Sequence, residues 1–399
     1  MGLNETPSAN RVHIGIFGRR NVGKSSVMNA LTNQSIAIVS EVLGTTTDPV
    51  LKAMELLPIG PVVMIDTPGI DDEGELGALR VKKSYQMLNK TDIAVMVLEG
   101  ETESPEDTSL IEKIRKKNIP LVIFCNKSDT LPDNFPKKEG HFYGSALKNI
   151  GINELKNEIA RLAKVSETDK KIVGDILAPL DIAVLVVPID SAAPKGRLIL
   201  PQQQTIRDIL EAGGISVVVK ETELAETLGK LGTPPKIVIT DSQAFGAVNR
   251  IVPKDILLTS FSILFARYKG NLEAAVRGAK ALDSLKDGDT ILISEGCTHH
   301  RQCGDIGTVK LPAWVKKHTG KNIYFEFTSG TEFPDDLSKY ALAIHCGGCM
   351  LNEREMKYRY AYAEEQGLPI TNYGIAIAHM HAILKRSVEP FEDIRKILG

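Results

Sequence analysis

The sequence predicts an α/β protein in which a domain with a parallel sheet is followed by two smaller α/β domains. Short apolar runs bounded by Gly, Pro, Asn and Asp alternate with helix-length segments, a pattern typical of parallel sheets. The 399 residues suffice for two or three domains, each with its own core. Hydrophobic residues make up 43% and charged residues 25% of the chain, which excludes a disordered or fibrous protein.

The first domain is predicted at residues 1–167. Its expected strands are the apolar runs at 12–17, 62–65, 93–98 and 121–125, and a charged, helix-prone segment at 154–171 closes it. Because helix-length segments separate the runs, the strands are expected to lie parallel.

The second domain is predicted at residues 168–255 and the third at 256–399. The second contains β-branched runs at 182–189, 215–219 and 236–240, with helices expected at 205–211 and 224–231, and it carries no chemical motif. In the third we expect strands at 290–294, 323–327 and 341–345 and helices at 272–285, 353–366 and 376–384.

The charge balance argues against nucleic-acid and membrane partners. Lys and Arg total 48 and Asp and Glu total 50, so no strong positive field is expected. The longest apolar runs are far shorter than the ~18 residues of a membrane-spanning helix. Residues 1–10 are polar, so we expect no signal peptide and a cytoplasmic protein.

A glycine-rich phosphate loop occupies residues 18–25, Gly-Arg-Arg-Asn-Val-Gly-Lys-Ser, between an expected strand and a helix. Glycines in such a loop allow backbone N–H groups to wrap a β-phosphate, while the lysine reaches the β- and γ-oxygens and the serine hydroxyl ligates Mg²⁺. The residues expected to bind the nucleotide here are Gly18, Asn21, Gly23, Lys24, Ser25 and Ser26.

Two further motifs follow in the order that a GTPase requires. Asp66-Thr-Pro-Gly69 comes after the expected strand at 62–65, so that Asp66 can hold Mg²⁺, directly or through water, and the Gly69 N–H can bind the γ-phosphate. The segment Gly44-Thr-Thr-Thr-Asp48 lies where a first switch loop belongs, and Thr46 is the candidate for a second hydroxyl on Mg²⁺. We therefore count Lys24, Ser25, Thr46, Asp66 and Gly69 as the candidate catalytic residues.

The base specificity is predicted from Asn126-Lys127-Ser-Asp129, which follows the expected strand at 121–125. The Asp129 carboxylate can accept both N–H donors of a guanine edge. Adenine would leave that carboxylate unpaired, at a cost of about 1–3 kcal/mol or more. Ser145 and Ala146 follow a short apolar pair and are expected to close over the base. GTP with Mg²⁺ is therefore the expected ligand.

These motifs resemble those of the TrmE–Era–EngA group of GTPases, although Thr47 replaces the arginine usual in that group's switch loop. Ras-like enzymes place a water-orienting Gln directly after the Asp-x-x-Gly segment, but this chain has Ile70. In the TrmE-like branch an asparagine at the position of Asn21 accompanies activation by K⁺. The resemblance thus implies a slow, K⁺-stimulated GTPase; the other interpretation of Asn21 is a simple turn residue.

A second constellation consists of cysteines. The chain has five, and an odd number in a long chain argues against a disulfide framework. Cys125 is interpreted as a core residue. Cys297-Thr-His299 and His345-Cys346-Gly-Gly-Cys349 each lie just past an expected strand. If those strands are parallel, both turns meet at one sheet edge, where open α/β sheets bind ligands.

The spacing leaves the metal open between structural zinc, held as Cys₃His or Cys₂His₂, and a [4Fe–4S] cluster held by three thiolates. Three thiolates would leave one iron open to an exchangeable ligand. The candidates for that fourth iron ligand are Asp305, His299, His345 and Cys303.

The GTPase motifs, the motif-free middle segment and the two cysteine turns together resemble the HydF family of [FeFe]-hydrogenase maturation GTPases. The resemblance implies a [4Fe–4S] cluster on Cys297, Cys346 and Cys349; Gly304 stands where a second acidic residue is expected, which weakens the fourth-ligand assignment.

The same resemblance implies a function for the whole chain. It would be a scaffold that carries a diiron precursor with CO and cyanide ligands, receives it with two radical-SAM maturases and delivers it to apo-[FeFe]-hydrogenase. The middle domain would mediate a homodimer or a higher assembly, and GTP binding and hydrolysis would regulate partner interactions. The alternatives are a ribosome- or RNA-associated GTPase with a structural zinc domain and a redox enzyme with a closed four-cysteine cluster.

Overall fold

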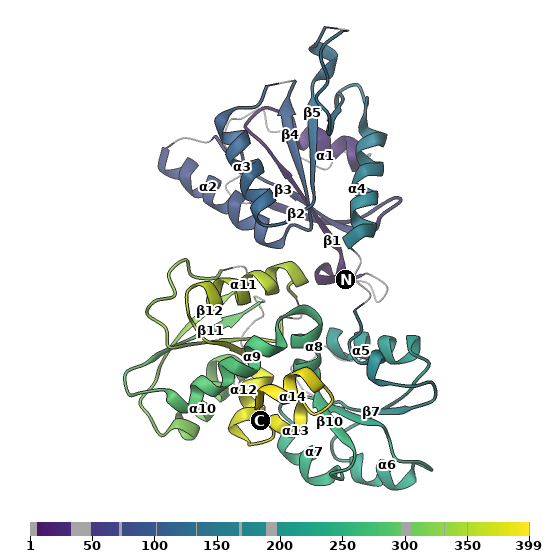
Figure 1. Ribbon diagram of the computed structural model, residues 1–399, viewed down its shortest axis with the longest axis vertical. Helices are drawn as coiled ribbons and strands as arrows, with labels where there is room; N and C mark the ends of the chain where they lie inside the picture. Colours follow the sequence, from purple (N-terminus) through teal and green to yellow (C-terminus); the bar gives the residue numbers. More distant parts are fainter. Residues whose placement is uncertain are drawn as a thin grey trace. The chain divides into compact units, whose positions relative to one another are not determined.

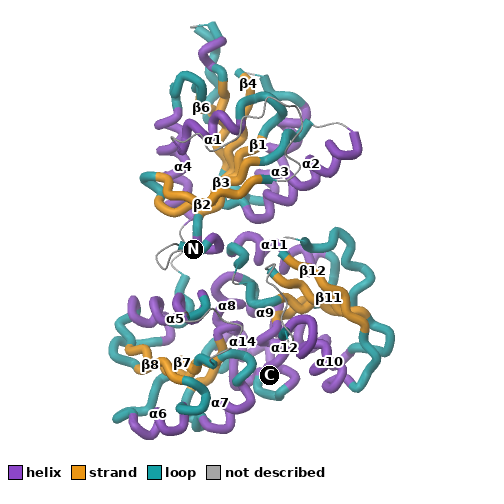
Figure 2. Tube along the Cα trace, turned by 180° about the vertical axis from the view of Figure 1, so that it is seen from behind, coloured by secondary structure: helices purple, strands orange, loops and turns teal. Residues whose placement is uncertain are grey.

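The computed structural model describes residues 6–32, 49–71, 74–100, 102–132, 134–166, 170–188, 198–296, 305–330, 332–348 and 350–398. The chain divides into two compact units, Met1–Thr168 and Asp169–Gly399 (Figures 1 and 2). Among the described residues, no helix is both long and apolar enough to cross a membrane.

The first unit is a sheet of the described strands in the order β2-β3-β1-β4-β5-β6, in which only β2 runs antiparallel to its neighbour. Its strands are β1 (Val12–Phe17), β2 (Val50–Leu56), β3 (Gly60–Asp66), β4 (Ile93–Glu99), β5 (Leu121–Asn126) and β6 (His141–Tyr143). Its helices are α1 (Lys24–Thr32), α2 (Gly74–Met87), α3 (Pro105–Lys116) and α4 (Ile152–Ser166).

Helices cover both faces of this sheet, with α1 and α4 on one face and α2 and α3 on the other (Figure 1). The alternation along β4 shows why: Ile93, Val95 and Val97 belong to one apolar core, and Ala94, Met96 and Leu98 belong to the other. A strand buried on both faces reads as a continuous apolar run, as the sequence predicted for a parallel sheet.

The second unit begins with a parallel sheet whose described strands lie in the order β10-β9-β7-β8. Its strands are β7 (Ile182–Val186), β8 (Ile215–Val219), β9 (Ile237–Thr240) and β10 (Leu257–Ser260), and its helices are α5 (Leu200–Glu211), α6 (Leu224–Lys230) and α7 (Phe245–Ile251).

A second parallel sheet follows in the same unit, in the order β12-β11-β13-β14. Its strands are β11 (Thr290–Glu295), β12 (Tyr324–Ser329), β13 (Leu342–His345) and β14 (Ile370–Asn372). The helices are α8 (Phe261–Lys269), α9 (Leu272–Ala279), α10 (Leu311–Thr319), α11 (Glu353–Glu365), α12 (Tyr373–Met380), α13 (Leu384–Ser387) and α14 (Glu392–Leu398).

One hydrophobic core joins the two sheets of the second unit. Val184 and Phe245 from the first half lie in the same buried cluster as Phe265 and Ile375 from the second. The first sheet also extends past the boundary predicted at residue 255, because β10 pairs with β9. The segments expected as second and third domains therefore form a single packing unit.

Two predicted helices differ from the observed ones for local reasons. The helix expected at 376–384 begins earlier, at Tyr373, because the Asn372 side chain accepts a hydrogen bond from the Ile375 N–H at 2.8 Å and caps it. It ends at Met380, before Ala382, whose φ of 56° is left-handed. The helix expected at 272–285 ends at Ala279 and continues as a 3₁₀ segment, η5 (Lys280–Ser284).

Candidate functional site: a phosphate loop and a cysteine turn

The phosphate loop runs from the end of β1 to the start of α1 and requires both of its glycines. Gly18 and Gly23 have positive φ angles of 146° and 92°. A Cβ at Gly18 would lie 2.3 Å from the Val97 carbonyl oxygen, and one at Gly23 would lie 2.3 Å from Asn126 Nδ2. Asn21, with φ of 59°, also takes the left-handed conformation that Asn tolerates better than most residues.

The Lys24 ammonium lies at the centre of this loop. Its Nζ donates to the carbonyl oxygens of Gly18 at 2.9 Å and Arg19 at 2.7 Å. The loop thus encircles a buried cation in the position from which a P-loop lysine reaches phosphate oxygens.

Ser25 and Asp66 form the predicted Mg²⁺ pair. The Ser25 hydroxyl donates to Asp66 Oδ2 at 2.9 Å. Burial raises the pKa of Asp66 above its ordinary value, although Ser25 and Lys24 oppose the shift. Asp66 Oδ1 is buried with no hydrogen-bond partner among the described residues. A hydroxyl beside an unsatisfied carboxylate oxygen fits Mg²⁺, which prefers hard oxygen ligands. Thr46, the third predicted ligand, lies outside the described residues.

The segment after Asp66 packs against the phosphate loop. The Arg20 N–H donates to Asp71 Oδ1 at 2.7 Å, and a Cβ at Gly69 would lie 2.5 Å from Arg20 Cγ. Gly69 therefore allows this close approach. Ile70 is 6% exposed and belongs to the apolar core with Phe17, so its side chain is not directed at an attacking water.

Asn126 at the end of β5 connects the phosphate loop to the base-binding loop. Its Nδ2 donates to the Val22 carbonyl oxygen and its Oδ1 accepts from the Ala146 N–H, both at 2.9 Å. Lys127 takes a left-handed φ of 60° and pairs with Glu99 at 2.7 Å. The amide of Asn126 therefore fixes the spacing between the phosphate and base ends of the site.

Asp129 has the charge that guanine recognition requires. The Ser145 hydroxyl, followed by Lys148, holds the pKa of this carboxyl below its ordinary value. The Lys148 ammonium lies 3.3 Å from Asp129 Oδ2. Asp129, expected at the guanine edge, and Ser145, expected to close over the base, thus lie together in one loop cluster.

The cysteine turn lies at the carboxyl edge of the second parallel sheet of the second unit. Cys346 directly follows β13, and Gly296 directly follows the neighbouring strand β11. The Gly296 N–H donates to Cys346 Sγ at 3.0 Å, and the Gly348 N–H donates to the same sulfur at 3.4 Å. Two N–H donors on one sulfur favour the thiolate, the form that ligates metals.

The other predicted ligands of this site, Cys297, Cys349, His299 and Cys303, lie outside the described residues. Cys297 is the next residue after Gly296 in the sequence. β11 and β13 pair in parallel, as the expectation that the two turns emerge at one edge requires, and the place of the turn at 297–299 stays a prediction.

His345 offers no free ring nitrogen to iron. Its Nε2 lies 2.9 Å from Arg359 Nη1, and its Nδ1 lies 2.7 Å from the Cys346 carbonyl oxygen. Because arginine can only donate, Nε2 accepts and Nδ1–H donates. Burial, together with the charge of Arg359, lowers the pKa of His345 to about 3. We therefore withdraw His345 as a candidate ligand, since it positions the Cys346 backbone instead.

Asp305 caps the short segment that leads into α10. Its Oδ2 accepts from the Thr308 N–H at 2.9 Å and from the Thr308 hydroxyl at 3.0 Å. The cap uses one carboxylate oxygen, Oδ2, so Asp305 remains a candidate fourth ligand.

Arg359 is the residue of this site that sequence analysis missed. The side chain is fully buried and donates to Glu355 Oε1 at 3.0 Å, to Ser294 Oγ at 3.0 Å and to the Gly330 carbonyl oxygen at 2.8 Å. Glu353 and Lys357 form a pair of the same spacing on α11, but it is exposed to solvent. No sequence signal distinguishes the two pairs.

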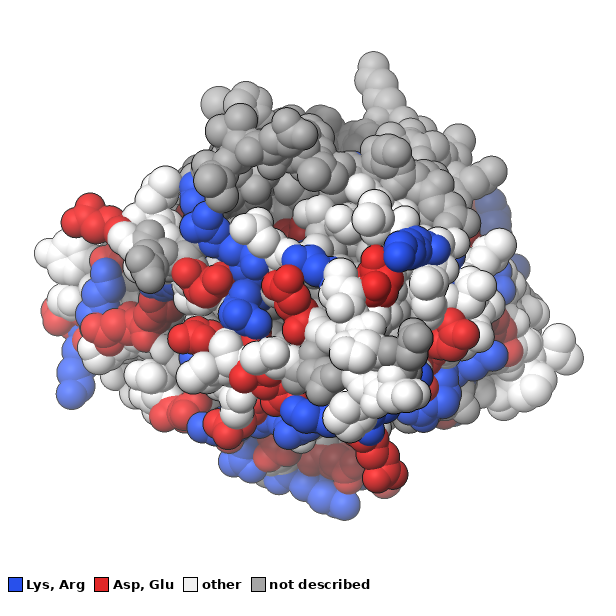
Figure 3. Space-filling view, turned by 90° about the horizontal axis from the view of Figure 1, so that it is seen from above, with Lys and Arg blue, Asp and Glu red and all other residues white. Residues whose placement is uncertain are grey.

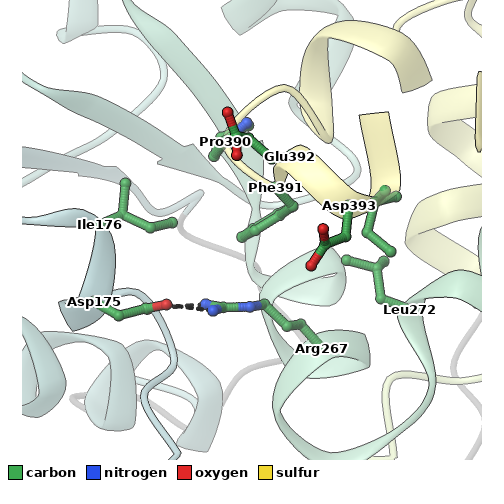
Figure 4. A pocket seen from close by; sticks show the side chains of 9 residues that line it. Asp175, Ile176, Arg267, Leu272, Pro390, Phe391, Glu392 and Asp393 are labelled. Atoms are coloured by element: carbon green, nitrogen blue, oxygen red, sulfur yellow. Dashed lines mark hydrogen bonds and ion pairs between the residues drawn. The ribbon is translucent and has the colours of Figure 1, made fainter. Parts of the chain in front are cut away.

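A hollow of about 490 Å³ elsewhere in the second unit does not form a comparable site (Figure 4). The Arg267 guanidinium there pairs with Asp175 and stacks over the Phe391 ring, 5.1 Å from its centroid. The hydrogen bond that Arg267 donates to Asp175 raises the pKa of Arg267, so the guanidinium stays charged and Asp175 compensates its charge. On the face shown in Figure 3, acidic and basic side chains of the described residues are interspersed.

Comparison with protein families divides the chain into three matches. Residues 13–127 match the family of 50S ribosome-binding GTPases. Residues 172–270 match the hydrogen maturase F dimerization domain, and residues 250–390 match the hydrogen maturase F tetramerization domain. The chain belongs to the hydrogen maturase F family.

Outside its two specific domains, this hydrogen maturase F chain is similar to tRNA modification GTPases MnmE. The protein of Aquifex aeolicus is 34% identical over 155 residues, which cover 38% of this chain and 34% of that protein. The GTPase Era of a Synechocystis species is 33% identical over 140 residues, covering 35% of this chain and 44% of the relative. The match thus spans about a third of the length of the MnmE relatives.

Among solved structures, Era of Aquifex aeolicus bound to GDP and AlF₄⁻ aligns with a TM-score of 0.35 and 20% identity. The alignment covers 55% of this hydrogen maturase F chain and 98% of that chain.

Proposed function

We propose that this protein is a GTP-regulated scaffold that binds a [4Fe–4S] cluster and carries a diiron precursor to apo-[FeFe]-hydrogenase. The observation that carries the proposal is the pair of hydrogen maturase F domains across residues 172–390, with the Cys346 sulfur accepting two backbone N–H groups at the carboxyl edge of a parallel sheet. A carrier needs an accessible site with a replaceable ligand, and three cysteines leave one iron open to such a ligand.

In this proposal Cys297, Cys346 and Cys349 hold the cluster. The donor set fits, because Cys346 accepts two backbone N–H groups, and such hydrogen bonds to sulfur tune cluster potentials. Asp305, His299 and Cys303 remain the candidates for the fourth position. An aspartate there would be a hard and exchangeable ligand, whereas Cys303 would close the site.

The nucleotide site is proposed to bind GTP with Mg²⁺ and K⁺ and to hydrolyse GTP slowly. Ser25 and Asp66 would hold Mg²⁺, and Lys24 would neutralise charge on the phosphates. Slow turnover is expected because Ile70 is packed in the core where Ras-like enzymes use a glutamine. The switch loops would change conformation with the bound nucleotide, and this change would decide whether the two radical-SAM maturases or the hydrogenase is bound. We propose that this exchange takes place in the cytoplasm.

Anaerobic reconstitution of the full chain with iron and sulfide tests the cluster. We expect a brown protein with a broad visible absorption band and about four irons per chain. The Cys346→Ala variant should lose this iron, and the Cys125→Ala variant, altered at a buried core cysteine of the other unit, should keep it.

A colourless protein that holds one zinc on thiolates would overturn the proposal and favour a ribosome- or RNA-associated GTPase with a structural zinc domain. Loss of the cluster in Cys303→Ala would instead indicate a closed four-cysteine site, as expected of an electron-transfer protein.

A further inference from the structure

Two histidines and an aspartate from three separate elements converge in the second unit, away from the cysteine turn. Asp283 lies in η5, His318 near the end of α10 and His379 near the end of α12. His318 Nε2 lies 2.9 Å from Asp283 Oδ1, and His379 Nε2 lies 2.9 Å from Asp283 Oδ2. One ligand atom from each residue can be chosen so that all three lie within 4.8 Å of one another.

This cluster lies at the opposite edge of the sheet from Cys346. Asp283 precedes the start of β11, whereas Cys346 follows the end of β13, and the two strands are parallel. His318 and His379 are near the carboxyl ends of helices that return to the starting edge of the sheet. Neither the nucleotide site nor the cysteine turn uses any of the three residues.

The geometry differs from that of ordinary surface ion pairs. The two imidazole rings pack edge to face with centroids 5.8 Å apart, and the side chains of His318 and His379 are only 25% and 17% exposed. Both rings aim the same nitrogen, Nε2, at one carboxylate. Although burial raises the pKa of Asp283, its contacts with both histidines hold the pKa below the ordinary value, so the carboxylate is ionised.

Two imidazoles and a carboxylate are a donor set that suits Zn²⁺. Ligand bonds of about 2.0–2.1 Å in a tetrahedron place ligand atoms about 3.3 Å apart. The two N···O distances of 2.9 Å end on different oxygens of Asp283, and the three ligand atoms, one from each residue, lie within 4.8 Å of one another, so they need to approach by at most about 1.5 Å to hold one ion. Asp283 is 57% exposed, so water can reach the fourth position.

We propose that Asp283, His318 and His379 form a Zn²⁺ site that joins η5 to α10 and α12 and takes a water molecule as its fourth ligand. The ion replaces the two hydrogen bonds as the connection among three segments that are distant in the sequence. Because Nε2 must be unprotonated to ligate, the proton that it donates to Asp283 moves to Nδ1 of the same ring, and each imidazole binds the ion as a neutral ligand.

Co²⁺ as a spectroscopic stand-in for Zn²⁺ tests the site in the full, cluster-loaded chain. We expect one Co²⁺ per chain with visible d–d bands and no thiolate-to-cobalt charge transfer, displaced by Zn²⁺. His318→Ala and His379→Ala should each weaken Co²⁺ binding more than about 10-fold. Loss of a residue that only hydrogen-bonds to a metal ligand already weakens binding about 10-fold, and loss of a ligand should cost more. His381→Ala is the matched control, because this exposed histidine lies two residues from His379 and outside the cluster.

Thermal unfolding provides a second readout that does not depend on spectra. Zn²⁺ should raise the Tm of the wild type and of His381→Ala, but not that of His318→Ala or His379→Ala, when each protein is compared with itself in chelator. Equal Zn²⁺ affinity in wild type and in the His318→Ala/His379→Ala double variant would overturn the proposal. Zinc bound at cysteines would show thiolate charge transfer with Co²⁺, so failure of the cluster proposal is distinguishable from failure of this one.

Discussion

Arg359 shows how a single buried charge organises the cysteine turn. Its guanidinium donates to Nε2 of His345, whose Nδ1–H holds the Cys346 carbonyl oxygen. The same guanidinium is paired with the buried carboxylate of Glu355. A buried ion pair adds little net stability, but loss of one partner leaves an uncompensated charge. The position of the Cys346 backbone therefore depends on a residue that need not touch the metal.

Arg359→Met should destabilise the second unit by about 3–5 kcal/mol, because Glu355 loses its buried partner. Lys357→Met is the matched control on the same helix; it breaks the exposed pair with Glu353 and should cost no more than about 1 kcal/mol. Urea unfolding followed by Trp314, the chain's single tryptophan, measures both losses. Equal losses in the two variants would contradict the role given to Arg359.

Asn21 permits a substitution that separates a backbone role from a side-chain role. Its φ of 59° is a conformation that glycine adopts without strain. We propose that the Asn21 side-chain oxygen is a ligand of K⁺. Asn21→Gly should therefore keep the loop and its GDP affinity but lose this ligand.

GTP turnover in K⁺ and in Na⁺ checks this prediction. The wild type should turn over faster in K⁺, and Asn21→Gly should show similar rates in both salts. K⁺ stimulation that survives in Asn21→Gly would leave Asn21 as a turn residue only.

At the scale of elements, features with local signals could be predicted from the sequence. The apolar run at 12–17 is followed by Gly18 and the run at 121–125 is followed by Asn126. The structure confirms both as strands, β1 and β5. β2 is an edge strand whose exposed and half-buried residues give no apolar run, so it was not predicted. The common core of the two later sheets also escaped prediction, because packing between distant segments leaves no local pattern.

The open edge of the first sheet in the second unit is the element we expect at the homodimer interface. β8 is an edge strand within the region that matches the dimerization domain, and its Ile215 and Val218 are 42% and 44% exposed. An edge strand with exposed β-branched residues is a template for pairing with a second chain.

Val218→Lys should therefore shift the protein from dimer toward monomer, as measured by sedimentation velocity. Leu147→Lys changes a more exposed apolar residue in the other unit and should leave the assembly state unchanged. A Val218→Lys protein that remains dimeric at wild-type affinity would place the interface elsewhere.

At the scale of the whole molecule, the phosphate loop and the cysteine turn lie on separate compact units, each with its own core. The phosphate loop belongs to Met1–Thr168 and the cysteine turn to Asp169–Gly399. Among the described residues, no side chain that hydrogen-bonds in the phosphate-loop site also hydrogen-bonds in the cysteine-turn site. Mutations at sites without shared partners have additive effects, so damage to one should not propagate to the other.

Lys24→Ala should thus reduce GTP turnover by about 100-fold or more, as for loss of a charge-stabilising donor, while iron loading stays at the wild-type level. Cys346→Ala should lose iron loading while GTP turnover stays at the wild-type level. Phosphate release and iron analysis on the same two preparations measure both quantities, and a thermal melt of each variant excludes global unfolding. If Lys24→Ala also fails to load iron, or Cys346→Ala also fails to hydrolyse GTP, the nucleotide and the cluster are held by one coupled site. GTP would then act on cluster assembly itself, and not on the choice of partner.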